Sequence, residues 1–471
     1  MSKNILMFSC ALAPIALSAQ TDQKPNIVII LADDLLRNEL SCYGGENITT
    51  KNIDKLAKEG MLFTSNYASE AISAPVRASL YTGLYPARSG TYYNHRKAYN
   101  TTKAVNDFMP QLGYRVGRVG KQHAAPESVY KFNELGGFPT NCNAAKPEPI
   151  NTSPIEKFMA EGDSPFLLYV CSITPHHPWT LGDASKYDPN KIKLPKFLID
   201  NKKTREIYTT YLAEIMALDE EVGTVRAAIK KAGKEDNTII MFLGENGYGF
   251  PGGKWTCWNP GVQSAMIVHY PEKIKAGKKT DAIVQYEDVL PTLIDFAGGK
   301  VQSELDGKSF KDVLLGKSKK HRDWAYFIYN NQPEGEPYSI RGIRGDKYTL
   351  LVNYNYQTQY TNMHIIGDEN RKPKLYWTAW EEGAKESEAN QKLYDRFLTR
   401  PEYELYDNKK DPDELNNLAQ DAKYDQIKQT MLEELKKWMI QQNDTGDKFD
   451  VATPKKKLSA KAKARLQNLP Q

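Results

Sequence analysis

Three continuous apolar runs restrict the fold of this chain most strongly. They cover residues 26–32 (NIVIILA), 166–173 (FLLYVCSI) and 238–243 (TIIMFL). Runs rich in β-branched and aromatic residues, without regular alternation of polar side chains, are typical of strands buried on both faces of a sheet. A long amphipathic helix is predicted at 205–231, shortly before the third run. The pattern indicates an α/β fold.

The first run ends in two adjacent carboxylates, Asp33 and Asp34. Ligand sites in open α/β sheets lie beyond the carboxyl ends of the strands. Neighbouring carboxylates repel each other unless a cation lies between them, and hard oxygen ligands favour Ca²⁺ or Mg²⁺. The alternative interpretation is an ordinary turn followed by a helix cap. The residues alone leave both open.

The segment 73–83 (SAPVRASLYTG) resembles a helix start, because Ser73 can act as an N-cap and Pro75 falls where a missing N–H costs nothing. Its spacing is more specific than a cap requires, with Arg77 four residues after the serine and a Thr-Gly pair at the end. This arrangement resembles the signature of the type I sulfatases, in which the first residue, Cys or Ser, is oxidised to formylglycine. The family usually has a small residue after the proline, whereas this chain has Val76.

Two loops after predicted strands are similar to further sulfatase motifs. The sequence GKQH at 120–123 resembles the G-K-x-H of the family and supplies Lys121 and His123. The sequence PHHP at 175–178 resembles P-H-x-P, with His176 as the residue that faces sulfate. His177 falls in the variable position and is expected to be structural or to point outward. Without the resemblance, the first loop could equally present ordinary surface residues.

A fourth loop, GENG at 244–247, departs from the family, which normally has S-D-H-G or S-D-N-G. Glu245 keeps the negative charge on a side chain one methylene longer. Ca²⁺ tolerates varied carboxylate geometry, so we expect metal binding to survive; a metal-poor site is the alternative.

The sequence FPGGKWTCWNPG at 250–261 resembles the corresponding loop of sulfamidases (N-sulfoglucosamine sulfohydrolases). By this resemblance Lys254 reaches the sulfate. Trp255 and Trp258 could belong to the core or form a platform for a sugar ring.

The resemblance implies an alkaline phosphatase-like fold, with a large mixed, mostly parallel sheet sandwiched by helices and a smaller C-terminal α+β subdomain built on an antiparallel sheet. It implies a sulfuric ester hydrolase that acts on a sulfated oligosaccharide, at O- or N-sulfate. The cofactors implied are formylglycine, made from Ser73 and hydrated to a diol that attacks sulfur, and Ca²⁺. The metal ligands implied are Asp33, Asp34, Ser73, Glu245 and Asn246.

The remaining roles are also carried over from the family. Arg77 and Lys121 steady the diol, and His123 is the base that helps to release sulfate. His176 and Lys254 hold sulfate and assist the leaving group. Two alternatives stay open: a phosphodiesterase or phosphonate hydrolase on the same scaffold, and a degenerate relative that binds sulfated glycans without catalysis.

A serine at position 73 implies a particular maturation partner. In the family, the aerobic formylglycine generator acts on Cys, whereas Ser is converted by a radical maturase of anaerobic type. The resemblance therefore favours a bacterial, periplasmic or secreted protein.

The two ends of the chain predict its organisation. Residues 1–20 resemble a cleaved signal peptide, 21–320 a catalytic domain, 321–450 a C-terminal subdomain and 451–471 a Lys-rich tail. A net charge of +5 is slight for 471 residues and indicates no nucleic-acid partner, and no later apolar stretch is long enough to span a membrane. Four cysteines beyond residue 20 leave one or two disulfides open.

Overall fold

The computed structural model describes residues 23–271, 273–367 and 372–446. The predicted signal peptide at 1–20 and the Lys-rich tail at 451–471 lie outside these residues. None of the helices among the described residues is long and apolar enough to cross a membrane. The four cysteines in this part of the chain are free thiols, so it contains no disulfide.

A nine-stranded sheet forms the centre of the described structure, in the order β4-β3-β5-β1-β6-β7-β2-β8, with β9 also paired to β2. Of these strands only β7 runs against its neighbours, β6 and β2. The predicted mixed, mostly parallel sheet is confirmed. Its strands are β1 (Asn26–Ala32), β2 (Met61–Tyr67), β3 (Arg115–Gly120), β4 (Asn133–Glu134), β5 (Phe166–Cys171), β6 (Thr238–Gly244), β7 (Gln263–His269), β8 (Lys278–Thr280) and β9 (Val284–Gln285).

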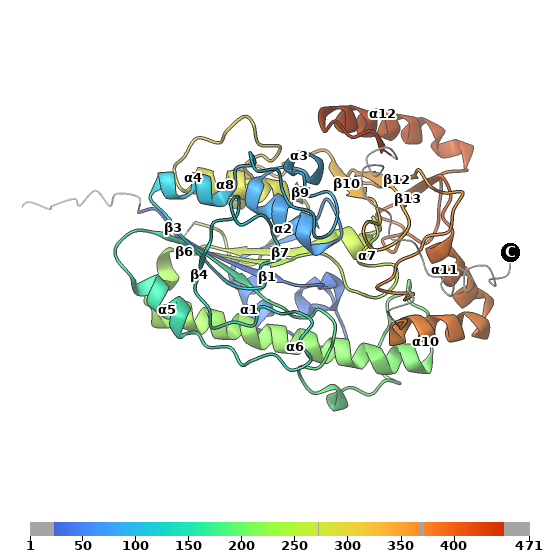
Figure 1. Cartoon of the computed structure of the whole chain (residues 1–471), viewed down its shortest axis with the longest axis horizontal. Coiled ribbons are helices and arrows are strands. Elements are labelled where there is room, and N and C mark those ends of the chain that lie inside the picture. The colour runs from blue at the N-terminus through green and yellow to red at the C-terminus, as the bar shows by residue number, and fades with distance from the viewer. Residues whose placement is uncertain (1–22, 272, 368–371, 447–471) are drawn as a thin grey trace, which may run out of the picture.

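Helices cover both faces of this sheet (Figure 1). Alternate side chains of β1 point to opposite sides, as the strand period requires. Val28 packs in a cluster with Leu212 of the long helix α6, whereas Ile29 packs in a second cluster with Leu80 of α2. The helices of this part are α1 (Lys51–Glu59), α2 (Ser73–Thr82), α3 (Pro86–Ser89), α4 (Val105–Phe108), α5 (Ser153–Ala160), α6 (Lys202–Lys231), α7 (Asn259–Val262), α8 (Val289–Phe296) and α9 (Lys311–Leu314).

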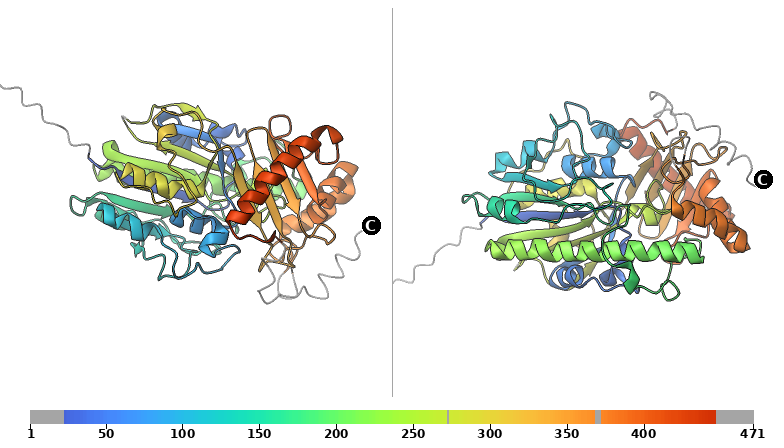
Figure 2. Two further views of the ribbon diagram at one scale, coloured as in Figure 1. Left: turned by 90° about the horizontal axis from the view of Figure 1, so that it is seen from above. Right: turned by 60° about the horizontal axis from the view of Figure 1, so that its bottom comes forward.

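A second sheet of four antiparallel strands, in the order β10-β11-β12-β13, lies beside the first (Figures 1 and 2). Its strands are β10 (Ala325–Tyr329), β11 (Ile340–Arg344), β12 (Tyr348–Asn353) and β13 (Tyr403–Asp407), and its helices are α10 (Leu375–Gly383), α11 (Glu388–Leu398) and α12 (Asp425–Gln441). Trp438 of α12 packs in one cluster with Leu350 of this sheet. The backbone N–H of Ile328 donates to the carbonyl of Ser69 at 2.8 Å, so the second sheet contacts the segment that leads to α2.

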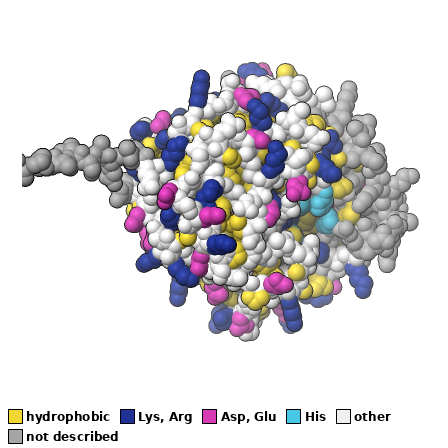
Figure 3. Space-filling view, turned by 60° about the vertical axis from the view of Figure 1, so that its left-hand side comes forward, with side chains coloured by type: hydrophobic (Ala, Val, Ile, Leu, Met, Phe, Trp, Pro, Cys, Tyr) yellow, Lys and Arg dark blue, Asp and Glu magenta, His cyan; other side chains and the backbone are white. Residues whose placement is uncertain are grey.

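Basic and acidic side chains are interspersed over the face shown in Figure 3, where histidines gather in one place. Such mixing of signs agrees with the slight net charge and gives this face no extended basic field.

Candidate active site

The candidate site lies where four adjacent parallel strands end. In the sheet order β3-β5-β1-β6, each carboxyl end is followed by residues singled out in the sequence. Because these ends share one edge of the sheet, side chains far apart in the chain meet there, such as Asp34 and Asn246, which are 212 positions apart. The side chains that meet are Lys121 and His123 after β3, His176 after β5, Asp33 and Asp34 after β1, and Glu245 and Asn246 after β6.

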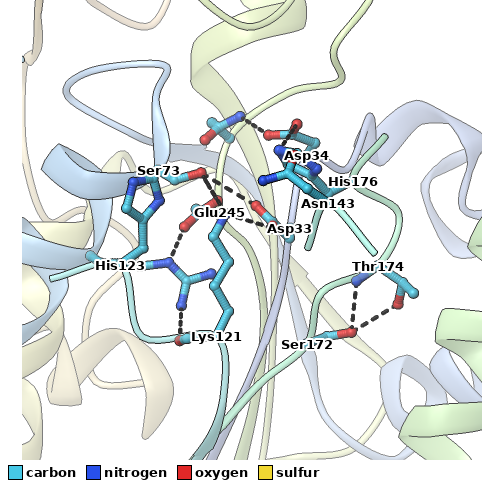
Figure 4. Close-up of polar contacts among 12 residues, drawn as sticks. Asp33, Asp34, Ser73, Lys121, His123, Asn143, Ser172, Thr174, His176 and Glu245 are labelled. Carbon is cyan, nitrogen blue, oxygen red and sulfur yellow. Dashed lines mark hydrogen bonds and ion pairs between the residues drawn. The ribbon is translucent and has the colours of Figure 1, made fainter. Parts of the chain in front are cut away.

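Ser73 is the first residue of α2 and is 1% exposed. The residue at the N-cap position is Ile72, and no side chain caps this helix, so the interpretation of Ser73 as a simple cap is wrong. The Ser73 hydroxyl instead donates to Oε2 of Glu245 at 2.7 Å and lies 3.3 Å from Oδ1 of Asp33. Nζ of Lys121 donates to it at 3.1 Å. The helix start therefore delivers a buried hydroxyl into a cluster of charges (Figure 4).

Three buried carboxylates meet beside this hydroxyl. One oxygen from each of Asp33, Asp34 and Glu245 can be chosen so that all lie within 4.8 Å of one another. The amide of Asn246 donates to Oδ1 of Asp34 at 2.9 Å, while its buried Oδ1 has no hydrogen-bond partner among the described residues. An unpaired amide oxygen next to three carboxylates suits a hard cation such as Ca²⁺. The residues present therefore fit the predicted metal, and the two aspartates do not cap a helix.

Three cationic side chains pair with these carboxylates. Nζ of Lys121 donates to Asp33 at 2.6 Å, and Nζ of Lys254 donates to Asp34 at 2.9 Å. Arg77, fully buried, pairs with Glu245.

The charges shift the pKa values of the site. Burial alone would raise the pKa of Asp33, but Lys121 and His176 hold it well below its usual range. Burial raises the pKa of Glu245 to about 8, even beside Arg77. The site thus contains two different carboxylates. Asp33 is ionised, whereas ionisation of Glu245 is unfavourable unless further positive charge lies nearby.

The two histidines of the PHHP loop have different surroundings. Nε2 of His176 is 3.6 Å from Oδ2 of Asp34, and burial lowers the pKa of its ring. The ring of His177 packs against Trp179 and Tyr376 instead. The prediction that His177 is structural agrees with this packing.

The two tryptophans after Lys254 belong to the interior. Trp258 is 2% exposed, and its indole N–H donates to Glu404 of β13 at 2.8 Å, so the interpretation of Trp258 as a sugar platform is wrong. Trp255 is 7% exposed and stacks on His364, with the ring planes 4° apart. One face of the Trp255 ring is therefore already covered.

Sequence reasoning missed two groups at this site. His95, on the loop after α3, lies 3.0 Å from His123. Cys142 lies next to Asp33 and His176, and Asn143 beside it is drawn near Asp34 in Figure 4. None of these residues belongs to a motif or directly follows a strand of the sheet. The sequence therefore contained no indication of their place at the site apart from the chemical type of their side chains.

The chain matches two family models. The model described as Sulfatase matches residues 25–299, and the model described as N-sulphoglucosamine sulphohydrolase, C-terminal, matches residues 245–378. An "Ulvan-active sulfatase" of Formosa agariphila is 29% identical over 95% of this chain and 90% of its own length. The human "N-sulphoglucosamine sulphohydrolase" is 26% identical over 89% of this chain and 90% of its own length.

The fold is also similar to that of solved structures. A protein crystallised with its substrate D-glucosamine-2-N,6-O-disulfate has a TM-score of 0.70 and 22% identity, over 90% of this chain and 99% of that chain. This likeness concerns the fold alone.

Proposed function

The chain belongs to the sulfatase family, and we propose that it removes sulfate from a sulfated glycan through a formylglycine made from Ser73, beside a bound Ca²⁺. The observation that carries this proposal is the convergence on the Ser73 hydroxyl of Lys121, Asp33 and Glu245, from three different strand ends. The relatives named for ulvan and for N-sulphoglucosamine support a glycan as the substrate class.

A serine hydroxyl alone is a poor nucleophile, and a formylglycine at this position supplies a hydrated aldehyde in its place. Lys121 donates to the oxygen at position 73 and so favours its negative charge. Arg77 fixes the carboxylate of Glu245, which in turn orients the same oxygen. These residues keep the reacting oxygen in one place before substrate binds.

Asp33, Asp34, Glu245 and Asn246 would hold Ca²⁺, which when bound supplies positive charge to polarise sulfate and the oxygen at position 73. Lys254 and His176 face the same carboxylate, Asp34. The ammonium group of Lys254 and the imidazole ring of His176 lie where an anionic sulfate can replace or share that partner. We assign two roles to both residues: they bind sulfate, and they assist departure of the leaving group.

Maturation and location belong to the same proposal. A serine-type radical maturase converts Ser73, and the product acts in the periplasm or outside the cell. Both points follow from the resemblance of Ser73 and of residues 1–20 to known signals.

The test compares protein made with and without a serine-type maturase. Mass spectrometry of the peptide containing Ser73 is expected to show loss of two hydrogens, about 2 Da, only after co-expression. Sulfate release from defined heparin, chondroitin and algal oligosaccharides is expected from the converted protein, and not from Ser73→Ala. Hydrolysis of phosphate or phosphonate esters in preference to sulfate esters would contradict the proposal, and so would tight glycan binding by converted protein without any sulfate release.

A further inference from the structure

Cys142 brings a thiol to the edge of the candidate active site. Its Sγ, one carboxylate oxygen of Asp33 and one ring nitrogen of His176 all lie within 4.8 Å of one another. Figure 4 draws the next residue, Asn143, beside His176. The thiol is free and half-buried; burial raises its pKa, and after burial the charges of Asp33 and Lys121 affect that pKa most. A thiol, an imidazole and a carboxylate therefore face one another inside the site.

The loop that carries Cys142 is closed and anchored by hydrogen bonds. The backbone N–H of Asn151 donates to the carbonyl of Gly137 at 2.7 Å, which closes the loop at its base. The hydroxyl of Thr180 donates to the carbonyl of Ala145, which ties the loop to the segment just after the PHHP sequence. These bonds hold the thiol near the site.

A backbone carbonyl orients the ring of His176. Nδ1 of His176 is 2.5 Å from the carbonyl oxygen of His177, and a carbonyl oxygen can only accept, so Nδ1 carries a proton and donates it. In the neutral ring Nε2 then has a free lone pair. Histidines that bind metals usually donate their other N–H to a carbonyl or a carboxylate in this way. The ring of His176 thus has the arrangement of a metal ligand.

This set of donors favours a different ion from the three carboxylates. Asp33, Asp34 and Glu245 offer only oxygen, which suits Ca²⁺, whereas thiolate and imidazole are typical ligands of Zn²⁺. A tetrahedral Zn²⁺, about 2.0 Å from nitrogen or oxygen and about 2.3 Å from sulfur, brings its ligand atoms to about 3.3–3.6 Å from one another. The half-buried side chain of Cys142 must therefore approach the other two ligands by no more than about 1.5 Å.

We propose that Asp33, Cys142 and His176 form a second metal site, which binds Zn²⁺ and thereby excludes sulfate. As the ion binds, the thiol releases its proton to solvent, and water takes the fourth position. Nε2 of His176 binds the ion through its lone pair, but it must carry a proton to donate to sulfate, so the two ligands exclude each other. Lys121 donates to Asp33 at 2.6 Å, so the ion is expected to bind reversibly and not as a permanent part of the fold. The inhibition rests on the proposed function, whereas the binding does not.

The binding test uses reduced protein with unmodified Ser73, saturated with Ca²⁺, and Co²⁺ as a coloured substitute for Zn²⁺. The wild type is expected to bind Co²⁺ with a thiolate-to-cobalt charge-transfer band, which Zn²⁺ then abolishes by displacement. Cys142→Ser is expected to lose the band and to bind Zn²⁺ at least about tenfold more weakly, since loss of a ligand costs no less than loss of a group that orients one. Cys42→Ser removes another half-buried free thiol and is the control, which should keep the band. No band in the wild type, an unchanged band in Cys142→Ser, or a band of full strength in His176→Ala would overturn the inference.

The kinetic test uses converted protein and compares each variant with its own rate in the absence of zinc. Zn²⁺ is expected to raise the KM of the wild type and of Cys42→Ser for the sulfated oligosaccharide and to leave kcat within about twofold. Calcium-saturated EDTA, which exchanges Ca²⁺ for Zn²⁺, is expected to reverse the effect. Cys142→Ser should need at least about tenfold more Zn²⁺ for the same rise in KM. An equal response of Cys142→Ser and the wild type, or a fall in kcat with KM unchanged, would overturn the inference. Absence of sulfate release by the converted wild type, with the cobalt band present, would instead count against the proposed function alone.

Discussion

Oε2 of Glu245 accepts a hydrogen bond from the Ser73 hydroxyl at 2.7 Å, while Oε1 of the same carboxylate pairs with Arg77. Glu245 stands where the family normally has an aspartate. Besides the oxygen that it can offer to a cation, its side chain links the Ser73 hydroxyl to the fully buried guanidinium of Arg77.

The variant Glu245→Gln tests this link. Above the raised pKa of Glu245, about 8, a neutral amide leaves the buried charge of Arg77 without its counter-ion, so we expect a loss of about 3 kcal/mol or more in the free energy of unfolding, measured in urea at about pH 9. We also expect the rise in Tm on adding Ca²⁺ to shrink, because one carboxylate of the metal site is gone. Glu245→Asp is the matched control and should keep most of the calcium response. Equal stability and an equal calcium response in Glu245→Gln would show that the carboxylate has neither role.

Lys254 is expected to matter for turnover more than for folding. Its Nζ lies 2.9 Å from Asp34, whose carboxylate also receives the amide of Asn246. Lys254→Ala should lower turnover of converted protein at least about tenfold, because one donor to the sulfate is lost. Circular dichroism and Tm establish that the variant folds. Turnover equal to the wild type would remove Lys254 from the site.

The adjacent histidines of the PHHP loop offer an internal comparison. His176 lies 3.6 Å from Asp34, whereas His177 packs between Trp179 and Tyr376. His176→Ala should lower kcat about a hundredfold, as removal of a transition-state donor does, while His177→Ala should lower Tm and leave kcat within about threefold. The reverse pattern of losses in kcat would mean that the loop presents the other ring to sulfate.

The resemblance to the family supplied the candidate site residues, and for those that directly follow strands there is also a topological reason for their convergence. Carboxyl ends of parallel strands share one edge, so Asp33, Lys121 and Glu245 had to approach one another once their strands were recognised. His95 lies on a loop after α3, and its approach to His123 depends on loop packing, which no local pattern encodes.

Two further features depend on contacts between distant parts of the chain. Strand β7 runs against its two neighbours because the chain returns from β6 to β7 without a crossover, and no local pattern in the sequence encodes that return. Trp258 could not be assigned to the core, because its partner, Glu404, is 146 positions away in the other sheet. Burial of this kind is decided by the docking of the two sheets.

Glu221 of α6 predicts a pH dependence of stability that is independent of catalysis. It is buried and accepts a hydrogen bond from Ser172 at 2.7 Å, and burial raises its pKa from 4.5 to about 7. Between these two pH values the folded protein retains a proton that the unfolded chain has lost. The stabilisation is therefore present at low pH and is lost as pH rises through about 7.

We expect the free energy of unfolding of the wild type to fall, relative to Glu221→Gln, by up to about 1.4 kcal/mol per pH unit within this window. The glutamine has nearly the same shape and is neutral at every pH, so other buried acids such as Glu214 and Glu287, whose pKa values are also raised to about 7, act equally in both proteins and cancel. Urea unfolding of both proteins from pH 5 to 9 measures the difference. If the two curves run parallel, Glu221 does not hold its proton in the folded state, and the hydrogen bond from Ser172 must then stabilise a buried carboxylate.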